Sequence, residues 1–101
     1  MPKGYWIVRI DVKNEEGYKP YVAGNAAIFK KYGAKFLVRG GKFEHPEGIS
    51  RARNVVIEFP DYRTALTCYH SPEYQANMKL RQPHSLADFL IIEGYDGPQP
   101  S

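Results

Sequence analysis

The chain has 101 residues, of which 43% are hydrophobic and 25% are charged, and its formal net charge is +3. This composition is typical of one globular domain and excludes a disordered chain. No apolar run is long enough to span a membrane, and the first residues lack the apolar stretch of a signal peptide. Cys68 is the only cysteine, so no internal disulfide can form and we expect a protein of the reducing cytoplasm.

The first elements in chain order are a strand and a helix. Residues 5–11 alternate between two faces, which predicts the strand. An apolar stripe with helical spacing covers 18–32, after a capping residue at Asn14. Pro20 would remove a hydrogen bond inside that helix. We therefore expect a short first turn at 14–18 and a main helix that starts near Pro20.

Two further strands are predicted in the middle of the chain. The first covers 35–39 and ends at Gly40, where the backbone can bend, although the sequence allows 42–44 to continue it at the edge of a sheet. The second covers 54–59, has the strongest strand pattern in the chain, and ends at Pro60.

A second helix is predicted after the capping residue Asp61, with an interruption before the last strand. Ser71 and Pro72 are typical of a new helix start, as N-cap and first helical residue. The helix then breaks at Pro83, and 87–95 predict the last strand.

The resulting order is β-α-β-β-α-β, which is the ferredoxin-like arrangement of an α+β protein. Right-handed crossovers give an antiparallel sheet with the spatial order 4-1-3-2. We expect one domain over 1–97 and a short tail at 98–101.

The predicted sheet is apolar on both faces. If alternate residues such as Trp6 and Ile57 face the helices, the opposite face still carries Tyr5, Ile7, Leu37 and Val56. An apolar area of this size on a small protein is typical of an interface. We therefore expect a homodimer in which two sheets pack face to face around a two-fold axis.

The second face is also expected to carry one charged residue per strand: Arg9, Arg39, Glu58 and Glu93. Two interpretations stay open for these residues. They form cross-strand ion pairs at the rim of the dimer contact, or they line a polar pocket in which carboxylates have shifted pKa values.

Several strings resemble a bacterial family known as domain of unknown function 1330. They are GYWI at 4–7, YGAKFLVRGG at 32–41, NVVIEFP at 54–60, CYHSPEYQ at 68–75 and EGYDG at 93–97. The resemblance implies a dimeric α/β barrel, a group that includes cofactor-independent monooxygenases, lactone isomerases and haem-binding enzymes. It also implies a site in the cleft between sheet and helices, while kinship with those enzymes is an analogy of fold only.

Six residues are candidates for binding a ligand in such a cleft: Asn25, Arg39, Glu58, Tyr69, Tyr74 and Arg81. Each also has a structural interpretation. The Asn25 amide would bond to the sheet or a loop, Arg39 and Glu58 would pair with each other, the tyrosines would be core residues with satisfied hydroxyls, and Arg81 would be a solvated helix end.

Other chemistries have little support in the sequence. His45, His70 and His84 are too far apart for a typical metal site, and Cys68 has no base beside it, so we expect it to be buried and inert. The predicted third strand lacks the aromatic run with which RNA-binding domains stack bases. We expect no metal, no cofactor and no nucleic-acid partner.

Two functional hypotheses remain, and the sequence leaves open whether the protein is an enzyme. In the first, a dimeric domain binds or converts a small molecule in the cleft between sheet and helices. In the second, the dimer is a structural or sensing module without small-molecule chemistry. A cavity of a few hundred cubic ångströms with converging unpaired polar groups would favour the first hypothesis, and a filled core with each arginine matched to an acid would favour the second.

Overall fold

The computed structural model describes residues 2–100. Met1 and Ser101 lie outside the described residues, so the predicted tail is described only as far as Pro100. In chain order the elements are β1 (Gly4–Val12), α1 (Glu15–Tyr32), β2 (Lys35–Arg39), β3 (Arg53–Phe59), α2 (Tyr62–His70), α3 (Pro72–Arg81), the short 3-10 helix η1 (Gln82–His84) and β4 (Ser85–Glu93).

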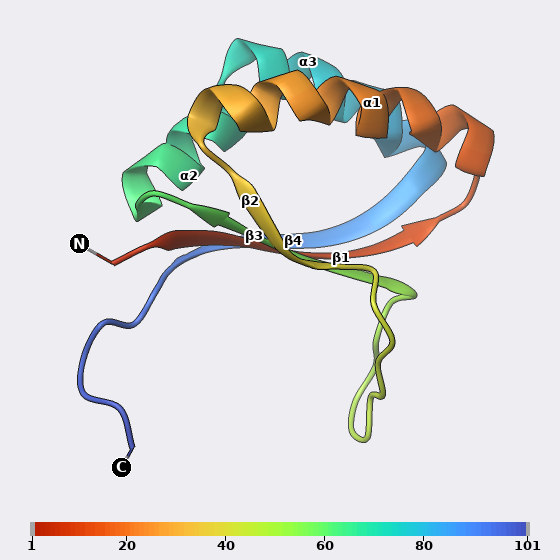
Figure 1. Ribbon diagram of the computed structural model, residues 1–101. Coiled ribbons are helices and arrows are strands. Elements are labelled where there is room, and N and C mark those ends of the chain that lie inside the picture. The colour runs from red at the N-terminus through yellow and green to blue at the C-terminus, as the bar shows by residue number, and fades with distance from the viewer. Residues whose placement is uncertain (1, 101) are drawn as a thin grey trace.

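The four strands form one antiparallel sheet in the order β2-β3-β1-β4. This is the predicted order counted from the other edge, so the ferredoxin-like prediction is confirmed. All three helices cover the same face of the sheet (Figure 1). We call this face the inner face and the opposite one the outer face.

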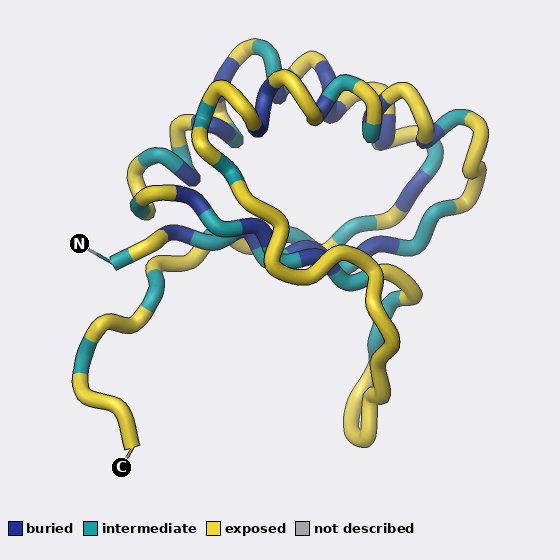
Figure 2. Tube along the Cα trace, in the orientation of Figure 1, coloured by how far each residue is buried: buried dark blue, intermediate teal, exposed yellow. Residues whose placement is uncertain are grey.

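The core lies between the inner face and the helices, and Figure 2 shows buried positions in both layers. Trp6 is fully buried, and its ring lies 4.9 Å from the rings of Phe59 and Tyr74 and 5.0 Å from that of Phe89. Its indole Nε1 donates to the carbonyl of Ala65 at 2.9 Å. These contacts of the Trp6 side chain therefore hold α2 and α3 against β1 and β4.

The first helix differs from the prediction around Pro20. α1 is continuous over Glu15–Tyr32, with Pro20 inside it. The first turn is well capped, because the Asn14 side chain accepts from the Gly17 amide at 3.1 Å. Since Pro20 and Glu16 are both exposed, the Glu16 carbonyl that loses its donor is free to bond to water. The predicted break was wrong for this reason.

The structure also defines the boundaries of two strands, β2 and β4. Residues 42–44 do not continue β2, because the chain leaves the sheet after Gly40, whose φ is +67°. The last strand runs over Ser85–Glu93 instead of 87–95. The helix cap at Asp61 and the restart at Ser71 and Pro72 are confirmed.

The outer face is uncovered and partly apolar. Leu86 and Leu90 are each 49% exposed, and Ile92 is 47% exposed. The connection between β2 and β3 and the segment after β4 both extend away from the sheet on this side (Figure 1). The outer face therefore lies between two projecting segments of the chain.

Candidate functional site

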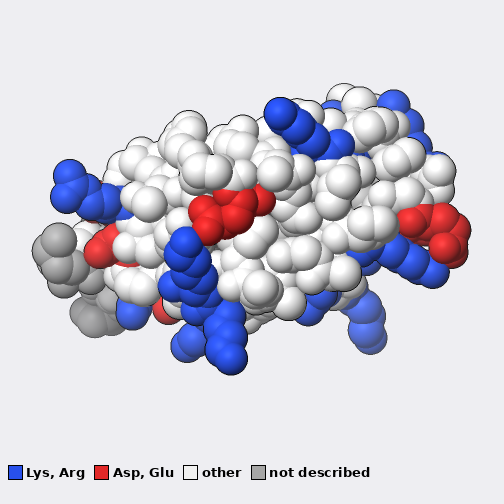
Figure 3. Space-filling view, turned by 90° about the horizontal axis from the view of Figure 1, so that it is seen from above, with Lys and Arg blue, Asp and Glu red and all other residues white. Residues whose placement is uncertain are grey.

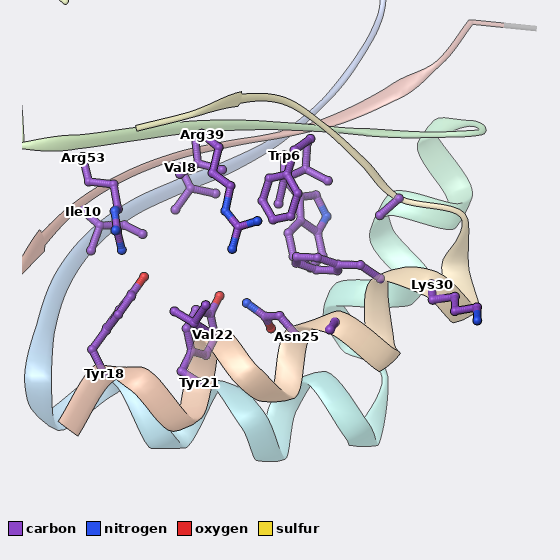
Figure 4. Close-up of a pocket in the computed structure, with 16 residues that line it drawn as sticks. Trp6, Val8, Ile10, Tyr18, Tyr21, Val22, Asn25, Lys30, Arg39 and Arg53 are labelled. Carbon is purple, nitrogen blue, oxygen red and sulfur yellow. The ribbon is translucent and has the colours of Figure 1, made fainter. Parts of the chain in front are cut away.

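A cavity of about 440 Å³ lies between the inner face and α1, toward the β2 edge of the sheet. Figure 4 shows α1 as one wall and the strands as the other. Ten of the lining side chains are apolar or aromatic without a hydroxyl: Trp6, Val8, Ile10, Val22, Ala26, Phe29, Ala34, Phe36, Val55 and Ile57. A largely apolar wall of this size is typical of a small-molecule site.

Two arginines enter the cavity from the strands. Arg39, at the end of β2, and Arg53, at the start of β3, both direct their guanidinium groups toward α1 (Figure 4). The Arg39 guanidinium lies 4.3 Å from the Phe36 ring centre, and that of Arg53 lies 5.6 Å from the ring centre of Tyr18. Among the described residues, neither arginine forms an ion pair, and no Asp or Glu lines the cavity. The lining therefore has unneutralised positive charge.

Asn25 presents its amide nitrogen to the same space. The Asn77 amide nitrogen donates to the Tyr21 carbonyl at 3.0 Å and to Asn25 Oδ1 at 2.8 Å. Because a backbone carbonyl can only accept, the Asn77 nitrogen must face it, and Asn25 must then present its oxygen to Asn77. The Asn25 NH₂ group is left pointing into the cavity, as Figure 4 shows, although the residue is only 9% exposed.

Tyr21 is a further donor, oriented by a buried partner. Its hydroxyl lies 2.8 Å from that of Tyr74, which is fully buried. The only other polar side chain beside the Tyr74 hydroxyl among the described residues is Arg81, which can only donate. Burial raises the pKa of Tyr74, so this phenol stays protonated. A buried hydroxyl needs an acceptor, so Tyr74 donates to Tyr21 and leaves the Tyr21 proton free for the cavity.

Arg81 lies behind this pair of tyrosines. It is 6% exposed, its guanidinium lies 5.4 Å from the Tyr21 ring centre, and its Nε is the one buried side-chain nitrogen or oxygen without a partner in the part of the chain that the structure describes. It is therefore a buried helix residue and does not match the solvated interpretation. It adds positive charge behind the wall without lining the cavity.

The expected charged set on the second face was wrong for two of its members. The strand register shifts at a bulge between Phe36 and Val38, which places Arg39 opposite Val55 on the inner face. Glu93 lies opposite Gly4, on the inner-face side of β4. Arg39 and Glu58 therefore lie on opposite faces and do not pair.

Arg9 and Glu58 remain on the outer face, but each interacts with a residue outside the expected charged set. Arg9 donates to Asn54 Oδ1 at 3.3 Å and to the Ile49 carbonyl at 2.9 Å. Glu58 lies 3.9 Å from the Lys3 ammonium. The four residues thus form neither a common pocket nor a ladder of ion pairs.

The structure separates the six candidates into three pairs. Asn25 and Arg39 line the cavity, and Tyr74 and Arg81 support Tyr21 from behind. Tyr69 lies outside the cavity, with its ring 6.0 Å from that of Trp6 and its hydroxyl donating to Met78 Sδ at 3.5 Å. Glu58 lies on the outer face.

Sequence reasoning missed four polar lining residues: Tyr18, Tyr21, Lys30 and Arg53. A usable signal was present, because Tyr18, Tyr21 and Asn25 follow one another at spacings of three and four and so share one helical face. The alternation in β3 also places Arg53 on the same face as Val55.

Cys68 is buried, and burial raises the pKa of its thiol to about 12, in agreement with the prediction of an inert thiol. Within residues 2–100, the structure contains no group of three or more His, Cys, Asp or Glu side chains placed to hold a metal ion. No helix in that range is both long and apolar enough to cross a bilayer. On the face formed by the helices, Lys and Arg are spread out rather than gathered in one patch (Figure 3).

Comparison with known proteins supports the predicted family. The family model described as Domain of unknown function (DUF1330) matches residues 3–95, which confirms the resemblance seen in the sequence. No curated protein matches the sequence.

Solved structures share the fold at low sequence identity. A protein of unknown function from Rhodopseudomonas palustris has a TM-score of 0.74 at 14% identity, over 95% of this chain and 85% of its own. SnoaB, a cofactor-independent oxygenase from Streptomyces nogalater, has a TM-score of 0.63 at 13% identity, over 99% and 97%. A dimeric ferredoxin-like protein of unknown function from Thermobifida fusca has a TM-score of 0.56 at 9% identity, over 90% and 92%.

Proposed function

We propose that the chain, which belongs to the DUF1330 family, binds a small organic molecule in the cavity between the sheet and α1. The observation that carries the proposal is the cavity itself, with a volume of about 440 Å³ and two arginines that no acid of the described part of the chain neutralises. A purely structural module would be expected to fill this space or to match each arginine with a carboxylate, as small domains gain stability from close packing. No reaction is assigned to the site.

The test is a thermal-shift screen of a metabolite library on the wild type and on Ala26→Phe. Ala26 is an exposed helix residue that lines the cavity, so a phenyl ring there occupies the space at a small cost in helix propensity, about 0.5 kcal/mol. A ligand present at 100 times its Kd stabilises the wild type by about 2.7 kcal/mol, and the stabilisation should disappear in Ala26→Phe. A wild type that no compound stabilises would contradict the proposal and favour a structural module.

We also propose that the outer faces of two copies pack together in a homodimer. The exposed leucines of β4 support this proposal, as does the position of the outer face between two projecting segments. The dimeric description of the Thermobifida fusca protein is consistent with it, although that likeness concerns the fold alone. Cytoplasmic location and bacterial origin stay predictions.

The dimer is tested by light scattering coupled to size exclusion at micromolar concentration. We expect a mass of twice the 11.6 kDa chain, and a monomer for Leu90→Lys, because a buried lysine without a partner is costly. Leu80→Lys is the matched control, since Leu80 is a similarly exposed leucine, 45%, on α3. A monomeric wild type would exclude this dimer.

A further inference from the structure

The polar groups that face the cavity are nearly all hydrogen-bond donors, and this property indicates which class of ligand the cavity accepts. The inference rests on the proposed binding function and makes it more specific. Donors come from both walls: Arg39 and Arg53 from the strands, and Tyr18, Tyr21 and Asn25 from α1. Asp and Glu are absent from the described lining, and the one amide there has turned its oxygen away.

The surrounding structure fixes the orientation of two of the three donors on α1, Asn25 and Tyr21. Asn77 holds the oxygen of Asn25, so that the nitrogen faces the cavity. Tyr74 supplies a proton to the Tyr21 oxygen, so that the Tyr21 proton is free to donate toward the ligand. Burial raises the pKa of Tyr18, which keeps that hydroxyl protonated as well. Asn25 is only 9% exposed, and its nitrogen donates to no group among the described residues. This nitrogen is open to the cavity, where a ligand can supply the acceptor.

The cavity is also positively charged, so its charge and its hydrogen-bond donors both favour an anionic ligand. Arg39 and Arg53 approach from the strands, opposite the tyrosines and Asn25 (Figure 4). Arg81 adds a third positive charge behind Tyr21, at 5.4 Å from its ring centre. Lys30 lines the far end of the cavity but points away from it. Planar guanidinium groups match the two oxygens of a carboxylate.

The rest of the cavity is apolar and aromatic. Trp6 lies on the side away from Tyr18 and Arg53 (Figure 4). The Phe29 ring lies 5.5 Å from that of Trp6 and 5.6 Å from that of Phe36. We propose that the ligand is an amphipathic carboxylate, with its oxygens between the two arginines and the donors of α1, and with an apolar body against the aromatic side chains. A phosphate monoester would satisfy the same donors, but the large apolar wall favours an anion of low hydration with an apolar body.

The single tryptophan of the chain makes the test direct, because Trp6 lines the cavity and its fluorescence reports occupancy. The probes are decanoate, 4-phenylbutanoate and 2-naphthoate, each compared with its neutral primary amide, together with 2-naphthyl phosphate. We expect saturable fluorescence changes with at least one carboxylate and at least tenfold weaker binding of its amide. Ala26→Phe should abolish both signals.

Two variants assign the effect to the proposed groups. Arg39→Gln with Arg53→Gln should weaken carboxylate binding at least tenfold and leave amide binding unchanged. Asn25→Asp keeps the oxygen that accepts from Asn77 and replaces the NH₂ group by a charged oxygen, so it should also weaken carboxylate binding at least tenfold. Thermal unfolding of each variant confirms that it is folded.

The outcomes separate the two proposals. If amides bind as tightly as carboxylates, or if the arginine variant binds carboxylates like the wild type, the cavity binds small molecules but the carboxylate class is wrong. If 2-naphthyl phosphate binds more tightly than 2-naphthoate, the class is phosphate instead. If neither these probes nor the metabolite library changes the Trp6 fluorescence or the unfolding temperature, the binding function itself is wrong.

Discussion

The space between the sheet and the helices has a filled half, which is packed with side chains, and a hollow half, which contains the cavity. The polar groups of the two halves differ in their hydrogen-bond partners. In the filled half, under α2 and α3, Trp6 Nε1 bonds to the Ala65 carbonyl and the Ser71 hydroxyl to the Cys68 carbonyl. In the hollow half, under α1, Arg39 and Arg53 have no acid partner among residues 2–100. Where it packs, the chain therefore satisfies its buried side-chain donors, apart from Arg81 Nε among the described residues, and where it opens it leaves two arginines without an acid. This difference favours the proposal that the hollow half binds a ligand.

The largest expected effect comes from a matched pair of substitutions, one in each half. Phe59 is fully buried in the filled half, whereas Phe36 lines the cavity and is 38% exposed. Phe59→Ala removes a ring from a close-packed core and should lower the free energy of unfolding by about 3–5 kcal/mol. Phe36→Ala removes a ring that already borders open space and should cost about 1 kcal/mol. Urea unfolding measures both.

Phe59→Leu serves as the milder variant if Phe59→Ala does not fold, and it should still cost about 1 kcal/mol or more. Equal losses for Phe59→Ala and Phe36→Ala would mean that the two halves are packed alike, and the comparison would fail.

The junction between the halves gives a sharper test at Gly24 and Asn77. A Cβ on Gly24 would collide with Asn77 Oδ1, and the Asn77 amide is held by its bonds to Asn25 and to the Tyr21 carbonyl. Gly→Ala inside a helix normally stabilises by about 1 kcal/mol. Here we expect Gly24→Ala to destabilise by about 1–3 kcal/mol, because the crowded amide cannot move aside freely.

The control is Gly24→Ala in an Asn77→Ala background, where the amide that the new Cβ would meet is absent. Asn77→Ala alone should cost about 1–3 kcal/mol, since it leaves the buried Asn25 oxygen without a donor. In that background Gly24→Ala should become neutral or stabilising. A Gly24→Ala effect of the same sign and size in both backgrounds would show that Asn77 does not limit this position, and a double-mutant cycle by urea unfolding measures the coupling.

The fold was predictable from the sequence because its signals are local and periodic. Alternation in β1 and β3, and the caps at Asn14, Asp61 and Ser71, each follow from a few neighbouring residues. Arg39 shows where such reasoning fails. A one-residue bulge at the edge of the sheet reverses the face of every later residue in β2, and no pattern in five residues specifies that bulge.

The site was predicted only in part for a related reason. Asn25 was recognised because a polar residue interrupted an apolar helical stripe. Tyr18 and Tyr21 were not, because an aromatic residue on such a stripe is equally typical of a core. Whether their hydroxyls meet a partner or open space depends on the distance between α1 and the sheet, which is set by tertiary packing and not by helical spacing.

The smallest expected effect concerns an ion pair that ties the two halves together at the surface. Lys31 of α1 lies 2.6 Å from Glu73 of α3, and this hydrogen bond is the main reason that the pKa of Glu73 falls from 4.5 to about 2. A lowered pKa in the folded state stabilises the fold above the unfolded-state pKa, and that contribution is lost as the pH falls through the folded-state pKa. Glu73→Gln should therefore lower the urea midpoint at pH 7, and the deficit should shrink between pH 4.5 and 2. Glu16→Gln, which removes a highly exposed pair with Lys19, should change the midpoint little at any pH. A Glu73→Gln deficit that persists unchanged at pH 2 would mean that the side chain acts through packing, and that charge does not join α1 to α3.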